Sequence, residues 1–350
     1  MIIYALDGLN GIKGVVDTFK SCIWTKQFFA QDDFQLVVAG TPYNMATLTR
    51  GTYLVREKDV TGQNSFKNVM IIENVESHYA PDEGEVLTIT GRGLKSILAR
   101  RIIWEQISAE GVNLGTVLEQ VMEDNVVSPS VAERAIPDFI FGLTIQIPET
   151  VDIQLFGENI AEWLQSVGEK YGYGWDVAIS GGKYLFRINK GTDLSDSVVL
   201  SPASDGILSC DYSKTTEGFA NVALVGGEGE GTSKHTASVG SASGLNRYET
   251  YVDGSAVSSN GDIITLATYL NMLKEYGAEQ LAGNGFTEAF DAEINPYGVY
   301  KIGLNYGLGD IVTIQTDTGI SATSRLIEMI ESEDETGTAV VGTFSEWEVE

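Results

Sequence analysis

Short runs of β-branched and aromatic residues, broken by turn-forming residues, restrict the fold of this chain more than any other feature. In the first 105 residues these runs are four to nine residues long, and glycine, proline or aspartate stands between them. Such spacing is typical of antiparallel strands in a barrel or sandwich. We therefore expect residues 1–105 to form a β domain that ends in a short helix near Leu94. The predicted strands are 34–39, 53–56, 69–77 and 85–91.

Residues 106–190 follow a different, more helical pattern. Asn113 can cap a helix whose apolar residues recur at helical spacing, and a second amphipathic helix over 159–171 ends at Gly172, a residue suited to a helix C-terminus. Ser180-Gly181-Gly182 then separates strands 174–179 and 183–188, which is typical of a hairpin. We expect 106–190 to be an inserted α+β domain.

Strand patterns return in residues 191–350, which we expect to form a second β domain. The segment 226–244 is rich in glycine and serine and predicts a flexible surface loop. A helix is predicted over 266–281, with Leu266, Tyr269, Leu270, Leu273 and Ala278 on its buried side. The predicted strands after it are 286–294, 310–315, 321–330 and 339–344.

The charge of the chain limits its partners. It carries 49 acidic and 22 basic residues, a formal net charge of −27. This balance argues against gripping nucleic acid over the whole surface and against adhesion to anionic lipid. The charge is not confined to one end, because 13 basic and 23 acidic residues precede residue 176 while 9 basic and 26 acidic residues follow. No apolar stretch approaches 20 residues, so no membrane-spanning helix is predicted.

Residues that could carry enzyme chemistry are few. The chain has two histidines, His78 and His235, and neither lies in a nucleophile motif or a zinc motif. The glycine-rich run at 226–231 is acidic and would repel phosphate. We therefore predict no cofactor, no metal site and no catalytic residue. Because carboxylates are abundant, a glycosidase pair stays open, and with it the alternative of a cell-envelope hydrolase or carbohydrate-binding β-protein.

Several short motifs follow one another in a set order over nearly the whole chain. They are IWTKQFF (23–29), MIIENVES (70–77), LTITGRGLKSILARR (87–101), FRINKGTD (186–193), NVALVGG (221–227) and YGLGDIVTI (306–314). In their order and spacing they resemble the baseplate hub and tail-associated proteins of siphophages and contractile tails.

This resemblance implies a β-rich α+β fold with two tube-like antiparallel β-barrel domains and inserted α+β domains. It also implies that the chain is a non-enzymatic structural protein of the virion tail tip, assembled in the host cytoplasm. Three copies would form a ring that adapts a sixfold tail tube to a threefold spike or fibre. The implied partners are a tube or distal tail protein above, a spike or fibre protein below, and a tape-measure protein and passing DNA in the channel.

For such a hub, the residues of interest line subunit interfaces and the channel. The chain has one dense basic cluster, which helix-dipole compensation explains in part and which also fits an intersubunit salt-bridge surface. It consists of Arg92, Lys95, Arg100 and Arg101. Acids on barrel strands would face the lumen and keep DNA from sticking. The candidates are Glu73, Glu76 and Asp310.

Overall fold

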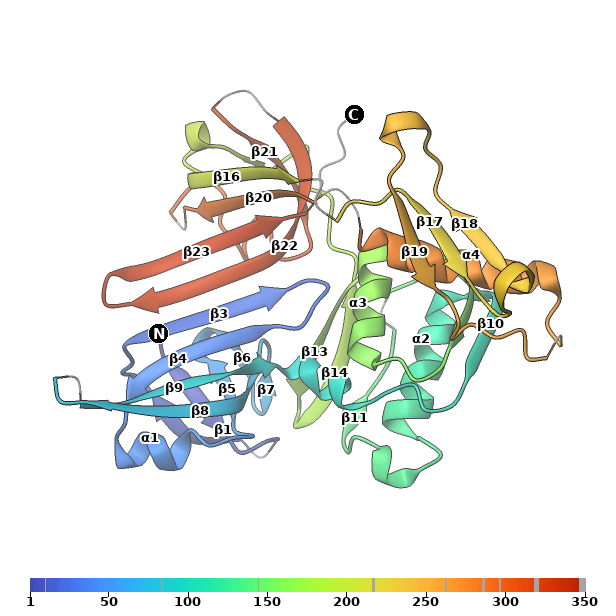
Figure 1. The fold of residues 1–350 in the computed structure, drawn as a ribbon. Helices are drawn as coiled ribbons and strands as arrows, with labels where there is room; N and C mark the ends of the chain where they lie inside the picture. Colours follow the sequence, from blue (N-terminus) through green and yellow to red (C-terminus); the bar gives the residue numbers. More distant parts are fainter. Residues whose placement is uncertain are drawn as a thin grey trace.

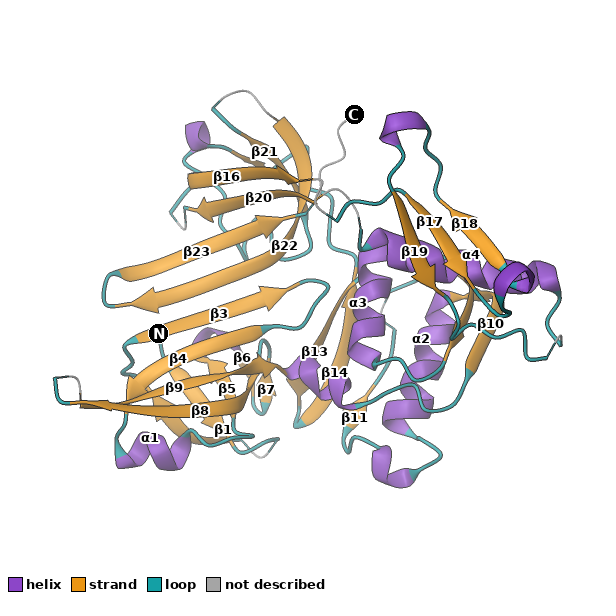
Figure 2. Ribbon diagram, viewed as in Figure 1, coloured by secondary structure: helices purple, strands orange, loops and turns teal. Residues whose placement is uncertain are grey.

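The computed structural model describes residues 1–350 except 10, 83, 144, 216–217, 262, 285–286, 296, 318–320 and 346–350. It is built mainly of antiparallel β-sheet, and the three longest helices gather on one side of the molecule (Figures 1 and 2). The predicted β-rich α+β class is confirmed. The predicted strand start at Phe286 lies outside the described residues.

One large sheet contains strands from both ends of the chain. Its order is β16-β20-β23-β22-β3-β4-β9-β8-β5-β1-β2, and β21 joins it through β22 while β15 pairs with β21. The N-terminal strands are β1 (Ile3–Leu6), β2 (Ile12–Val16), β3 (Ser21–Gln27), β4 (Asp33–Ala39), β5 (Tyr53–Arg56), β8 (Met70–Ala80) and β9 (Gly84–Gly93). The C-terminal strands are β15 (Val199–Leu200), β16 (Ile207–Thr215), β20 (Thr287–Ile294), β21 (Ile311–Gln315), β22 (Ser321–Asp334) and β23 (Gly337–Phe344).

The two β-rich regions meet where β3 pairs with β22. The pairing is antiparallel and continuous from Ser21 opposite Asp334 to Gln27 opposite Glu328. Each region keeps its own apolar core. One core holds Trp24, Phe34 and Leu36, because alternate residues of β3 and β4 point inward, and the other holds Ile314 and Phe344.

The first inserted unit packs two helices against short sheets. Strands β10 (Ile107–Asn113) and β12 (Thr150–Leu155) pair with each other, and helices α2 (Leu114–Met122) and α3 (Ile160–Tyr171) lie nearby. Asn113 caps α2 as predicted, and Asn159 caps α3. Gly172 ends α3, as predicted, in the left-handed conformation at φ 76°. A further sheet has the order β11 (Phe139–Ile140), β14 (Lys183–Asn189), β13 (Gly174–Ser180), β7 (Ser65–Phe66) and β6 (Val60–Gly62).

A second α+β unit interrupts the C-terminal β region. Helix α4 (Leu266–Ala282) covers a sheet in which β17 (Val222–Gly226) lies between β18 (Thr236–Val239) and β19 (Glu249–Asp253). The prediction of a loop throughout 226–244 was therefore wrong, because β18 pairs with β17 and shields Ala237 in the core under α4. Leu266 was also misplaced. It is 55% exposed in the first turn of α4, while Tyr269 and Leu273 are buried as predicted.

Short helices complete the fold. Helix α1 (Pro42–Thr47) lies beside β2. Single 3₁₀ turns span Glu57–Asp59, Ala132–Arg134, Pro202–Ser204, Gly231–Ser233 and Gly244–Asn246, a longer 3₁₀ segment spans Leu94–Arg100, and a π-helical turn spans Glu123–Val127. The segment Leu94–Arg100 connects the large sheet to the first inserted unit and takes part in the site described next.

Candidate functional site: a junction of three parts of the chain

The three larger parts of the chain meet around Phe28, just after β3. Its backbone N–H donates to the Ile327 carbonyl of β22 at 2.7 Å, and its carbonyl accepts from Trp175 of β13 at 3.4 Å. Two glycines leave room for its ring, since a Cβ on either Gly174 or Gly309 would lie 2.1 Å from a ring carbon. The first belongs to the inserted unit and the second to the C-terminal region, so the Phe28 ring fits between them.

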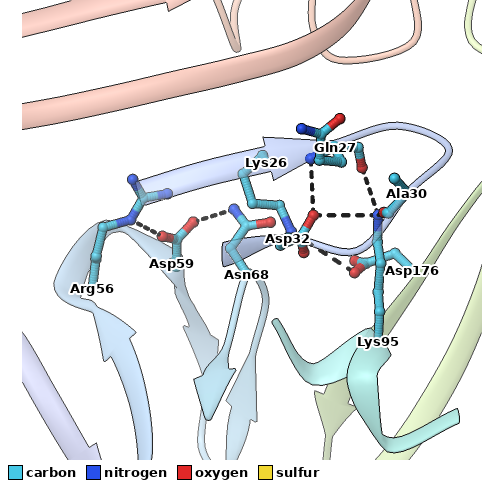
Figure 3. A network of polar contacts seen from close by, with 9 residues as sticks. All are labelled: Lys26, Gln27, Ala30, Asp32, Arg56, Asp59, Asn68, Lys95 and Asp176. Carbon is cyan, nitrogen blue, oxygen red and sulfur yellow. Dashed lines mark hydrogen bonds and ion pairs between the residues drawn. The ribbon is translucent and has the colours of Figure 1, made fainter. Parts of the chain in front are cut away.

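Next to Phe28 lies a group of four charged residues, which we call the buried junction: Lys26, Asp32 and Lys95, which are buried, and Asp176, which is partly exposed. Figure 3 shows that they come from β3, the β3–β4 connection, the 3₁₀ segment and β13. Lys26 forms an ion pair with Asp32, and its Nζ lies 4.0 Å from Asp176 Oδ1. Lys95 Nζ lies 3.3 Å from Asp32 Oδ1. Two positive and two negative groups therefore lie together, and of the four only Asp176 is partly exposed to solvent.

The remaining hydrogen-bonding capacity of the buried junction is taken up by backbone. Asp32 Oδ1 accepts from the Gln27 N–H at 2.9 Å. Lys95 Nζ donates to the carbonyls of Gln27 at 2.5 Å and Ala30 at 3.0 Å, and it lies 5.2 Å from the centre of the Trp175 ring. Unpaired buried charges cost free energy, and these hydrogen bonds to backbone groups offset the cost of burying Asp32 and Lys95.

The pKa shifts of the buried junction follow from the same geometry. Burial alone would raise the pKa of Asp32, but the charges of Lys26 and Lys95 and the Gln27 N–H outweigh it and hold the pKa below its ordinary value. Burial lowers the pKa of Lys95, and the two aspartates offset this only in part. For Lys26 the aspartates outweigh burial, and its pKa is raised. Asp32 is thus a carboxylate that two lysines keep ionised.

A second buried ion pair links the first β region to β22. Arg56 Nε donates to Asp59 Oδ2 at 2.6 Å, and Asn68 Nδ2 donates to the other oxygen of Asp59 at 2.6 Å (Figure 3). Arg56 Nη1 also lies 2.9 Å from Glu331 Oε1 on β22, while the guanidinium stacks 5.0 Å from the Trp24 ring centre. The two β-rich regions are therefore joined by side chains as well as by strand pairing.

Sequence comparison places the chain in a family. A model of siphovirus ReqiPepy6 Gp37-like proteins matches residues 2–344. The chain belongs to this family. No curated protein sequence matches it.

Solved structures show which fold the Gp37-like chain has. The 43 kDa tail protein of prophage MuSo2 from Shewanella oneidensis aligns with a TM-score of 0.62 at 11% identity, over 98% of this chain and 97% of that one. A tail protein from Neisseria meningitidis MC58 aligns with a TM-score of 0.59 at 15% identity, over 99% and 95%. Prophage tail protein gp18 from Listeria monocytogenes EGD-e gives 0.54 at 10% identity, over 98% and 94%. The Gp37-like chain thus has the fold of phage tail proteins, and the resemblance noted in the sequence is confirmed.

The four residues of the predicted basic patch lie in different environments. Lys95 is 2% exposed and belongs to the buried junction, so its inclusion in a surface patch was wrong. Arg101 donates to the Arg134 carbonyl at 2.6 Å and so connects the end of the 3₁₀ segment to the first inserted unit. Arg100 is exposed, and Arg92 is partly exposed.

The predicted lumen acids are also distributed over separate places. Glu73 forms a two-pronged ion pair with Arg92, at 2.7 and 2.8 Å, and the hydrogen bonds from Arg92 lower its pKa. Glu76 is exposed on β8. Asp310 accepts from the backbone N–H groups of Thr192 and Gly307, both at 2.8 Å, and so fixes the entry to β21. Whether any of them faces a channel stays a prediction.

Two features are absent from the described part of the chain. None of its helices combines the length and apolarity that crossing a bilayer requires. Its histidine, cysteine, aspartate and glutamate side chains form no group of three or more that could hold a metal ion.

Proposed function

We propose that this Gp37-like chain is a structural hub at the distal end of a phage or phage-like tail, and that three copies form a ring around the tail axis. The β3–β22 pairing carries the proposal. It sets two β-rich regions side by side in one continuous sheet, so three chains would supply six such regions. A threefold ring of this kind can match a sixfold tube on one side and a threefold spike or fibre on the other.

The rigid connection between the two β-rich regions supports this role. A ring that adapts one symmetry to another must keep its repeated units at a fixed spacing. Here Phe28 and the Arg56–Glu331 ion pair lie at the contact between the regions, and the buried junction holds the first region to the neighbouring inserted unit. Strand pairing and buried ion pairs together resist hinge motion between the two units.

The charge of the chain fits a channel through which DNA passes. A net charge of −27 repels phosphate, which lowers sticking while the polymer slides. In this proposal a tube or distal tail protein binds above the ring, a spike or fibre protein binds below it, and a tape-measure protein occupies the lumen before DNA does. Glu76, exposed on β8, is the best remaining candidate for a lumen acid.

Ring formation can be tested on the purified chain by native mass spectrometry. We expect a trimer, and we expect Arg100→Glu to weaken it by about tenfold, because an exposed interface cation would become a like charge against an acidic neighbour. Lys274→Glu, the same change on the exposed side of α4, is the matched control and should leave the trimer intact. A chain that stays monomeric at all concentrations would rule out ring formation.

The position in the particle needs a separate measurement. Cryo-electron microscopy of assembled particles should place the chain on the central axis at the tail tip. Density for the chain away from that axis would overturn the hub proposal even if the isolated chain trimerised.

A further inference from the structure

An open cavity of about 380 Å³ lies where the two inserted α+β units meet, and we call it the α3–α4 cavity. The end of β12, helix α3 and helix α4 all contribute to it. This volume is within the usual range for ligand pockets. Aromatic residues from three elements line it, namely Phe156, Trp163 and Tyr276.

Three carboxylates line the same cavity without a cation among them. They are Glu158, Glu162 and Glu279, and no lysine, arginine or histidine belongs to the described lining. Lys170 on α3, whose charge acts on Glu279, is already paired, with its Nζ 2.8 Å from Glu275 Oε2. The cavity is therefore both aromatic and negatively charged.

Glu279 illustrates the excess of negative charge in this cavity. Burial raises the pKa of Glu279 to about 7, Lys170 opposes the shift, and Glu275 and Glu158 add to it. Trp163 offers a second sign that something is missing, because it is 4% exposed and its indole N–H has no hydrogen-bond partner in the described structure. Buried polar groups are normally partnered. The carboxylates call for a cation, whereas the indole N–H can only donate and needs an acceptor, such as a backbone carbonyl of a chain that carries the cation.

We propose that the α3–α4 cavity binds a lysine or arginine side chain presented by a partner protein. The positive head group would lie against Glu279 and Glu158, and the alkyl stem would pack on Trp163 and Tyr276, as basic side chains do on aromatic faces. Phe156 favours a protein over a free small cation, because it is 64% exposed at the rim and would be covered by the chain that carries the basic residue.

The test uses the full chain labelled with ¹⁵N-tryptophan, in which the five tryptophans give separate indole signals. The probe is the capped peptide Gly-Gly-Arg-Gly-Gly at pH 8, titrated to about 10 mM. We expect a saturable shift of the Trp163 signal while the other four stay in place. The same peptide with citrulline, which keeps the shape of arginine without its charge, should bind about tenfold more weakly.

Variants separate the cavity from the rest of the surface. Glu279→Gln should weaken binding of the arginine peptide about tenfold. Glu169→Gln, an exposed position on α3 outside the cavity, should change it by less than about twofold. The unchanged signals of the other tryptophans report that each variant is folded.

Three results would overturn the proposal: no saturable shift of Trp163 at the highest peptide concentration, equal binding of the citrulline peptide, or binding of spermidine as tight as that of the peptide. The last would assign the cavity to free polyamines instead of a protein side chain. None of these results depends on whether the chain forms a ring.

Discussion

Carboxylates are buried between packed elements in two places, the buried junction and the α3–α4 cavity, and the two differ in charge balance. In the buried junction, Asp32 and Asp176 face Lys26 and Lys95, and backbone groups satisfy the rest. In the cavity, Glu279 lies among other acids, and Lys170, the cation that opposes its pKa shift, is paired with Glu275. Where the buried charges are paired with one another, the contact needs no further group. Where carboxylates lack a cation, the contact can still bind one.

The largest effect is expected at the balanced site. Asp32→Asn leaves Lys26 and Lys95 buried without their shared carboxylate, and loss of one partner of a buried pair typically costs about 3–5 kcal/mol. Because the native pKa of Asp32 is lowered from 3.8, its contribution is present above pH 4 and is lost as pH falls below that value. Urea unfolding of the original chain and the variant at pH 7 and pH 3 measures the free-energy cost and its dependence on pH.

Asp33→Asn is the control for this prediction, since Asp33 is the next residue and is exposed. It should change the free energy of unfolding at pH 7 by less than about 1 kcal/mol. Equal effects of the two substitutions would mean that the buried junction contributes nothing special to stability.

Glu279 in the cavity should give stability the opposite dependence on pH. The folded-state pKa of Glu279 is raised from 4.5 to about 7, so between these values the native state holds a proton that the unfolded state has released. This contribution to stability is therefore lost as pH rises from 4.5 to 7. Glu279→Gln should stabilise the chain at pH 8 by on the order of 2 to 3 kcal/mol and change little at pH 4.5. Parallel loss of stability in both proteins between these pH values would contradict it.

Local sequence signals were sufficient for much of the fold. The cap at Asn113 and the end of α3 at Gly172 depend on neighbours within one helical turn, and both were predicted correctly. The strand β18 was missed because its Gly- and Ser-rich surroundings resemble a linker. What makes it a strand is pairing with β17 and burial of Ala237 under α4, neither of which is local.

The two sites were harder to predict for the same reason. Lys95 was predicted to belong to a basic surface patch. It is buried instead, because it pairs with Asp32, which lies more than sixty residues earlier in the chain. The available signal was its position inside Leu94-Lys95-Ser96-Ile97-Leu98, whose other members are all buried. Glu279 carried no such signal, because its burial arises from the packing of α4 against α3 and β12.

The smallest change is expected at Lys170, whose positive charge opposes the raised pKa of Glu279. Its ion pair with Glu275 is partly exposed, so Lys170→Gln should cost less than about 1 kcal/mol at pH 5. The same substitution removes the opposing charge and should raise the pKa of Glu279 further, which ¹³C NMR of the carboxyl group can follow against pH. If the pKa of Glu279 stays in place or falls, Lys170 does not act on it, and the α3–α4 cavity is less sensitive to added positive charge than its three carboxylates imply.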